Sequence, residues 1–211
     1  MPVKKMIAKQ PVRKNPKNSF TICVSGAARG LTVEKNAQLA FSVGKYIALQ
    51  GHALITGATI GLPDWAAKGA KSVGGLSIGI SPAASKHEHI KKYGLPTDDY
   101  DFILYSGLRY VGRDGLLIQS SDAVLSIGGR MGTLHEFATA VESKKPVGVV
   151  EGAGGVGDEF ERLMVAAGMC YDGICDAKQD VFFSEDPELL VKKIISVLEE
   201  RQKKRTLVPK L

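Results

Sequence analysis

A glycine-rich stretch near the middle of the chain has the residue types that hold a phosphate. Directly after an apolar run that ends at Ile127, the sequence reads Gly128-Gly129-Arg130-Met131-Gly132-Thr133. Glycines let the backbone turn tightly and approach an anion, and the free N–H groups at a helix start donate hydrogen bonds to it. Arg130 adds a guanidinium that pairs with phosphate oxygens. The stretch 128–133 therefore predicts a phosphate-binding loop.

Glu136 follows this loop and has two interpretations. Thr133 and Glu136 have the spacing of a capping box, in which each side chain bonds a backbone N–H at the helix start. Alternatively, Glu136 is a chemically active carboxylate. Arg113 is then the candidate partner, because it stands near the start of a helix expected over 113–121 and can reach the same crevice. Arg109 competes for that role, and a plain surface arginine is the alternative reading of Arg113.

Two more glycine-containing turns follow predicted strands. The first contains Ser25, Gly26 and Arg29, and the second runs from Gly57 to Gly61. In an open parallel sheet, ligands bind outside the carboxyl ends of the strands, near the point where the strand order reverses. Both turns are therefore expected to line the crevice beside the loop 128–133.

The elements that position these turns alternate regularly along the chain. A helix capped by Thr32 is expected to run to about Gln50, a second begins at Pro63, and the last begins at Pro187. Continuous apolar strands are typical of a parallel sheet covered on both faces. The pattern predicts an α/β fold, a single doubly wound, mostly parallel Rossmann-like sheet with helices on both faces. The expected strands are 20–25, 53–56, 76–81, 102–105, 123–127, 147–150 and 181–183.

The net charge of +6 belongs to the start of the chain. Residues 1–18 contain six basic and no acidic residues, and the remainder is balanced at 22 of each sign. Such a segment is typical of a disordered basic tail, with nucleic-acid binding as the alternative. The predicted organisation is a tail over 1–18, one domain over 19–200, and a basic C-terminal tail over 201–211. Residues 19–150 have no basic stripe with interleaved aromatics, which argues against nucleic acid as a partner.

Other function classes are disfavoured by composition. No apolar run reaches the ~18 residues of a membrane span, and no apolar stretch follows the basic N-terminus as in a secretory signal. Three cysteines do not suggest a disulfide framework, so a reducing, cytoplasmic location is expected. Cys23 is expected to fill a buried strand, whereas Cys170 and Cys175 lack the further ligands of a zinc site.

Two motifs outside the loop 128–133 suggest other ligands. The segment 152–157 formally matches the dinucleotide fingerprint. Asp158 and Glu159 follow at once, however, and place carboxylates where a pyrophosphate would lie, so a mobile loop at the crevice edge is favoured over an NAD site. His87-Glu88-His89 suggests a metal, but its polar surroundings and the lack of a third ligand favour an exposed loop. No metal site is predicted.

The stretch from Arg113 to Glu136 resembles the signature of the LOG family, long mislabelled as lysine decarboxylases. That signature is an arginine, an aspartate nine residues later, an apolar strand and Pro-Gly-Gly-x-Gly-Thr-x-x-Glu. Arg113, Asp122 and the segment 128–136 fit it. The segments 56–62, 66–70 and 75–82 also resemble the family's second glycine loop, helix and third strand, so the resemblance covers about residues 19–150.

Two departures make the chain more similar to the molybdenum-cofactor carrier subgroup. Ile127 replaces the proline of the signature, and Asp114 replaces the lysine that follows the arginine in hydrolytic members. The resemblance implies a protein that binds a phosphorylated nucleotide or pterin, requires no cofactor for activity, holds molybdenum cofactor or a nucleoside monophosphate as ligand, and forms homo-oligomers. The alternative is a phosphoribohydrolase that cuts nucleoside 5′-monophosphates to base and ribose 5-phosphate, with Glu136 and Arg113 as the catalytic pair.

Overall fold

The computed structural model describes residues 19–171, 174–175 and 180–207, so the segment 1–18 lies outside the described residues. Its main sheet has seven strands in the order β4-β3-β2-β1-β5-β6-β9, and all six pairings are parallel. This confirms the predicted doubly wound parallel sheet. The strands are β1 (Thr21–Gly26), β2 (Ala53–Thr56), β3 (Ser77–Ser81), β4 (Phe102–Tyr105), β5 (Ala123–Ile127), β6 (Val147–Val150) and β9 (Val181–Ser184).

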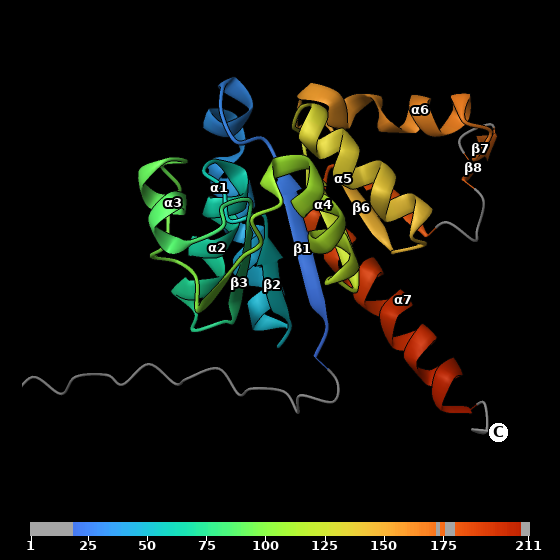
Figure 1. The fold of residues 1–211 in the computed structure, drawn as a ribbon. Helices are drawn as coiled ribbons and strands as arrows, with labels where there is room; N and C mark the ends of the chain where they lie inside the picture. Colours follow the sequence, from blue (N-terminus) through green and yellow to red (C-terminus); the bar gives the residue numbers. More distant parts are fainter. Residues whose placement is uncertain (1–18, 172–173, 176–179, 208–211) are drawn as a thin grey trace, which may run out of the picture.

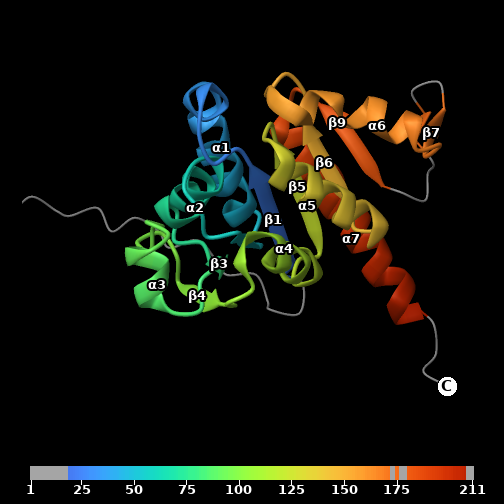
Figure 2. The ribbon, with the colours of Figure 1, turned by 45° about the horizontal axis from the view of Figure 1, so that its top comes forward.

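Helices cover both faces of the sheet, as Figures 1 and 2 show. Helices α1 (Leu31–Leu49), α2 (Leu62–Ser72) and α7 (Pro187–Leu207) enclose one apolar core, and α4 (Arg109–Gln119), α5 (Met131–Glu142) and α6 (Phe160–Ala166) enclose the other. The short helix α3 (Lys86–Lys91) precedes the edge strand β4. A 3-10 turn, η2 (Gly155–Glu159), precedes α6, and the short strands β7 (Cys170–Tyr171) and β8 (Ile174–Cys175) pair antiparallel.

The strand order reverses between β1 and β5, which are neighbours in the sheet. After β1 the chain builds outward through β2, β3 and β4 on one side, and α4 then returns it to β5 on the other side. The segments that follow β1 and β5 therefore leave the same sheet edge toward opposite faces. This divergence opens a crevice at the carboxyl ends of the two strands, where ligands bind in open α/β sheets.

Several helix ends differ from those expected. The helix α1 begins at Leu31 with Gly30 as its N-cap and no side-chain cap, so Thr32 does not cap it. Pro63 does lie in the first turn of α2, where its missing N–H costs nothing. The last helix begins at Pro187 as expected but continues to Leu207, so the boundary predicted at residue 200 falls inside α7.

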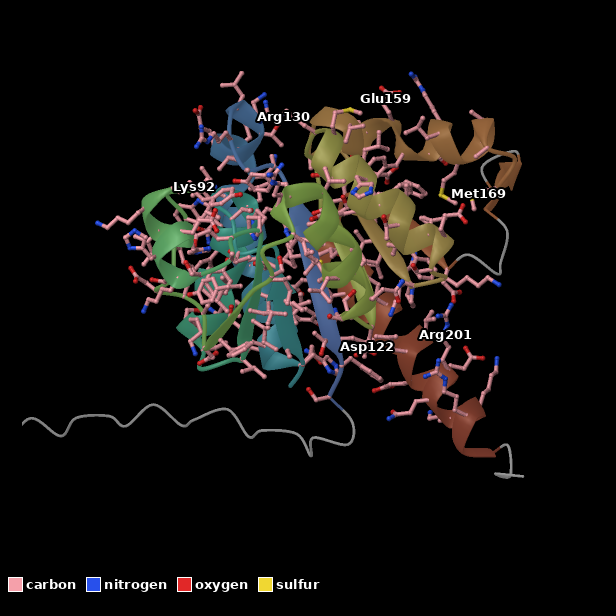
Figure 3. All side chains as sticks on the ribbon, in the orientation of Figure 1. Lys92, Asp122, Arg130, Glu159, Met169 and Arg201 are labelled. Atoms are coloured by element: carbon pink, nitrogen blue, oxygen red, sulfur yellow. The ribbon has the colours of Figure 1, made fainter. Side chains whose placement is uncertain are left out.

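Contacts of Arg201 hold α7 against the segments that precede β6 and β9. Its guanidinium donates to the carbonyl of Lys144 at 2.8 Å and pairs with Asp180 at 2.5 Å. Arg201 is labelled on this helix in Figure 3. Residues 201–207 are therefore helical, and the basic side chains of Lys203, Lys204 and Arg205 are exposed on this helix.

Two other expectations concern buried side chains. Cys23 is fully buried in β1, as predicted. His89 is also fully buried, and its ring nitrogens contact Ser81 Oγ at 2.8 Å and the carbonyl of Pro96 at 2.9 Å. The interpretation of 87–89 as an exposed loop is therefore wrong for His89, which lies in α3. Within the described part of the chain, no helix combines the length and apolarity that crossing a membrane requires.

Candidate functional site

A cavity of about 390 Å³ lies at the carboxyl ends of β1 and β2, between α4 and the start of α5. Arg130, which lines it, is labelled at the upper sheet edge in Figure 3. Of the residues predicted for the site, the cavity wall includes Ser25, Gly26, Gly57, Arg113, Arg130, Met131, Gly132, Thr133 and Glu136. The structure therefore brings residues from four separate segments of the sequence together, as the sheet topology requires.

The two glycines after β5 adopt a backbone conformation that other residues rarely adopt. Gly128 has φ 56° and Gly129 has φ 111°. A Cβ atom on Gly129 would lie 2.1 Å from Thr133 Oγ1, and one on Gly128 would lie 2.7 Å from the carbonyl oxygen of Gly154. Both positions therefore require glycine, because a side chain would clash with neighbouring atoms and because the backbone has positive φ. They do not line the cavity themselves but shape the turn that aims the N-terminus of α5 at it.

A second glycine-rich segment, 152–157, packs behind this turn. A Cβ atom on Gly155 would lie 2.2 Å from the carbonyl oxygen of Gly129. Asn36, buried in α1, donates to the carbonyl of Ala153 at 2.8 Å. The segment that resembles a dinucleotide fingerprint and was expected as a mobile crevice edge is therefore held between α1 and the loop 128–133.

The capping-box interpretation of Thr133 and Glu136 is wrong. The helix α5 begins at Met131 with Arg130 as its N-cap, and no side chain caps it. Glu136 therefore lies more than one turn inside the helix. Its carboxylate accepts a hydrogen bond from Ser25 Oγ and pairs with Arg113 Nη1 at 3.1 Å. The Glu136 side chain lines the cavity instead of capping the helix.

Arg113 is a buried residue of the site and not a surface arginine. The helix α4 begins at Arg109, four residues earlier than expected, which places Arg113 in its second turn with 3% of its surface exposed. The guanidinium lies over Gly57, where a Cβ atom would come within 2.1 Å of Nη1. Arg109 is exposed at the helix start and does not line the cavity.

Burial of the Glu136 side chain favours its protonated form. Burial raises the pKa of this carboxyl from 4.5 to about 7, the Arg113 guanidinium opposes the rise, and the neighbouring Asp114 adds to it. A carboxyl with a pKa near neutrality can hold or release a proton under physiological conditions, which is a property of groups used as acids and bases.

Asp114 and His135, which were not predicted to pair, form a contact between α4 and α5. Asp114 Oδ2 lies 2.9 Å from His135 Nδ1, and Asp114 Oδ1 lies 3.4 Å from Arg113 Nη1. Asp114 is buried, whereas 45% of the His135 side chain is exposed and the residue lines the cavity. The one available signal was sequence position, because Asp114 follows Arg113 and His135 precedes Glu136.

Some predicted site residues lie outside the cavity wall. Arg29 is exposed in the segment between β1 and α1, and Gly61 is the N-cap of α2. A Cβ atom on Gly61 would lie 2.4 Å from the carbonyl oxygen of Ala27, so Gly61 supports the turn after β1. The wall also includes Ala27, Ala28 and Thr59, which belong to the two turns expected at the crevice. Further wall residues outside the predicted turns and loop are Val24, Pro63, Tyr110 and Val111.

Asp122, the aspartate of the predicted signature, lies at the opposite end of the sheet. Figure 3 labels it at the lower edge, away from Arg130. Its carboxylate accepts a hydrogen bond from the Thr21 N–H at 2.7 Å, and its own N–H donates to the Thr21 carbonyl at 2.7 Å. Asp122 therefore joins the starts of β1 and β5 and has no contact with the cavity.

Comparison with known proteins agrees with the resemblance drawn from the sequence. The model of the SLOG cluster4 family matches residues 19–182. An uncharacterized protein from Archaeoglobus fulgidus is 38% identical over 125 residues, which are 56% of this chain and 77% of that protein.

Two solved structures share the fold. The molybdenum cofactor binding protein from the phototrophic bacterium Rippkaea orientalis is 29% identical with a TM-score of 0.66, over 85% of this chain and 98% of that one. The Moco carrier protein from Chlamydomonas reinhardtii is 27% identical with a TM-score of 0.68, over 87% of this chain and 99% of that one. The match with carrier-type structures over nearly their whole length confirms the predicted likeness to that subgroup.

Proposed function

The chain belongs to the SLOG cluster4 family, and we propose that it binds a phosphorylated pterin or nucleotide in the manner of a molybdenum-cofactor carrier. The observation that carries this proposal is the cavity at the reversal of strand order, with the N-terminus of α5 and Arg130 on its wall. The similarity to structures named for binding or carrying molybdenum cofactor supports the same class of ligand.

The phosphate of the ligand is assigned to the loop 128–133. The backbone N–H groups of Met131, Gly132 and Thr133 begin α5 and have no earlier turn to bond to, so they are donors for an anion. Arg130 is exposed and lines the cavity, so it can add a charged hydrogen bond. Because Gly128 and Gly129 carry no side chain, the turn stays narrow enough to bring these donors to the cavity.

Molybdenum cofactor fits the chemistry of this wall. Its phosphate would be held by the loop 128–133, and its pterin would lie in the remaining space beside Tyr110 and Val111, whose exposed side chains offer an apolar surface. The cofactor itself supplies the metal chemistry that it performs in the enzyme that receives it. The contribution of this chain is to bind and shield the ligand.

Calorimetry with matched ligands tests the proposal. We expect AMP to bind and adenosine to bind at least tenfold more weakly, because charged hydrogen bonds to a phosphate contribute roughly 1.5–3 kcal/mol each. Arg130→Ala should weaken the binding of AMP and leave that of adenosine unchanged. Equal affinity for AMP and adenosine would contradict the assignment of the phosphate, as would retention of full affinity in Arg130→Ala.

The alternative function is hydrolysis of nucleoside 5′-monophosphates, and a specific observation favours it. Arg113 Nη1 lies 3.1 Å from Glu136 Oε1 at the cavity wall, and the pKa of Glu136 is raised to about 7. A carboxylate beside a sugar stabilises the positive charge that develops when an N-glycosidic bond breaks. Against it, Arg113 Nη1 also contacts Asp114, whose position a lysine occupies in hydrolytic members of the LOG family.

Chromatography for free base separates carrier from hydrolase. Wild type is incubated with AMP, GMP, CMP and UMP, and Glu136→Gln is the matched variant. We expect no release of base and the co-purification of a phosphorylated pterin. Turnover that disappears in Glu136→Gln while AMP still binds would overturn the carrier proposal. The expected cytoplasmic location, homo-oligomeric state and lack of a nucleic-acid partner stay predictions.

A further inference from the structure

The pair formed by Asp114 and His135 has a defined hydrogen-bond polarity. Asp114 is buried, and its two carboxylate oxygens are directed to Arg113 Nη1 at 3.4 Å and to His135 Nδ1 at 2.9 Å. A carboxylate paired with a guanidinium has only acceptor atoms, so the hydrogen in the contact with His135 lies on Nδ1. In the neutral imidazole, Nε2 then carries a lone pair and is an acceptor.

His135 presents this acceptor at the cavity. The residue lines the cavity with 45% of its side chain exposed, and it stands four residues after Met131 on α5. Four residues correspond to about 6 Å along a helix axis. The same wall therefore combines backbone donors at the start of α5 with an acceptor about one turn further along the helix.

We propose that His135, fixed in the Nδ1–H tautomer by Asp114, accepts a hydrogen bond from a hydroxyl or N–H group of the phosphorylated ligand. This inference rests on the proposed function, because it assigns the non-phosphate part of the same ligand. Asp114 is then a positioning residue, and His135 selects ligands that carry a hydrogen-bond donor beside the phosphate. A ribose hydroxyl and a pterin N–H both provide that chemistry.

The tautomer is measured without any ligand. The chain contains four histidines, so ¹⁵N–¹H spectra of the imidazole rings are simple, and His135→Ala assigns the signal of His135. We expect the Nδ1–H form in wild type. Asp114→Asn offers an amide that can donate to Nδ1, so it should convert the ring to the Nε2–H form in part or in full. A wild-type ring in the Nε2–H form would overturn the inference.

Ligand selectivity then distinguishes ligand contact from a merely structural link between α4 and α5. The probes are two matched pairs, each differing in one kind of donor: AMP with 2′,3′-dideoxy-AMP, which lacks the ribose hydroxyls, and a phosphorylated pterin with its N,N-dimethylated amine derivative, which lacks the amine N–H groups. We expect wild type to prefer the donor-bearing member of one pair by about 5-fold, as for one neutral hydrogen bond. His135→Ala should reduce that ratio below about 2-fold, whereas a structural link would weaken both members equally.

Two further variants serve as controls. His135→Gln places an amide oxygen near the position of Nε2 and should retain most of the preference. His87→Ala removes an exposed imidazole from α3, outside the cavity wall, and should leave the preference unchanged. If phosphorylated probes bind but His135→Ala leaves both ratios as in wild type, the inference is wrong and the proposed function stands. If no phosphorylated probe binds wild type, the proposed function fails and the inference fails with it.

Discussion

The N–H of Val156 donates to the carbonyl oxygen of Gly129 at 3.0 Å, which joins the two glycine-rich segments of the chain by a backbone hydrogen bond. Gly155, one residue earlier, lies so close to Gly129 that its Cβ would come within 2.2 Å of the same oxygen. The segment 152–157 therefore determines the shape of the loop 128–133 without lining the cavity. Ligand binding should be sensitive to changes in a segment that makes no contact with the ligand.

Gly155→Ala tests this dependence, and Gly152→Ala is its control. Both glycines have positive φ, 74° and 69°, so alanine is strained at either position. No atom lies within 4 Å of a Cβ on Gly152, whereas a Cβ on Gly155 clashes with Gly129. We expect Gly152→Ala to lose about 1 kcal/mol of stability in urea denaturation and Gly155→Ala to lose more, because of the added clash. Only Gly155→Ala should weaken AMP binding, by at least fivefold. Equal AMP affinity in the two variants would contradict the role of the segment.

The Glu136 carboxyl should make stability depend on pH. Its pKa is about 7 in the folded protein and about 4.5 when unfolded, mainly because burial disfavours the charged form. Between these values the folded state binds more protons, so the free energy of unfolding falls as pH rises from 4.5 through 7. The full loss is on the order of 3 kcal/mol.

Urea denaturation at pH 5, 6, 7 and 8 measures this slope. Glu136→Gln cannot ionise and should lose less stability over the range than wild type. Glu142→Gln, at an exposed position on the same helix, is the matched control and should follow wild type. A slope in Glu136→Gln equal to that of wild type would show that the buried carboxyl is not the cause.

Steric room at Gly57 should be necessary for the position of Arg113. Gly57→Ala would bring a Cβ within 2.1 Å of Arg113 Nη1, so the guanidinium must move away from Glu136. We expect reduced stability and weaker AMP binding. Gly115→Ala, in the open interior of α4, should instead raise stability by roughly 0.5–1 kcal/mol and leave binding unchanged. Calorimetry and thermal melts of both variants check the contrast, and unchanged binding in Gly57→Ala would contradict it.

The strands could be predicted from the sequence because continuous apolar runs identify buried parallel strands. Ala53–Thr56 and Ala123–Ile127 have the predicted bounds and are buried throughout. The helix starts were harder to predict, since the N-cap residues of α1 and α5 are Gly30 and Arg130 and neither helix has a side-chain cap. Thr133 therefore has the spacing of a capping residue, but it lines the cavity and does not cap α5.

The candidate site was predictable where it depended on local backbone chemistry. Glycines before a helix identified the loop 128–133 whatever its neighbours were. The pairing of Asp114 with His135 depends instead on how α4 packs against α5, and sequence spacing does not contain that information. The same limit applies to Asp122, which belongs to the motif, because the spacing does not show that its hydrogen bonds lie at the far end of the sheet.

Asp122 should be required for stability and not for ligand binding. Its carboxylate accepts from the Thr21 N–H at 2.7 Å, at the end of β1 away from the cavity. Asp122→Ala removes this acceptor at an exposed position, where water can take its place, so we expect a loss of about 1 kcal/mol. Asp122→Asn keeps an acceptor oxygen and should lose less. AMP affinity, measured by calorimetry well below the melting temperature, should equal that of wild type in both variants, and a fivefold loss in either would place Asp122 in the binding machinery after all.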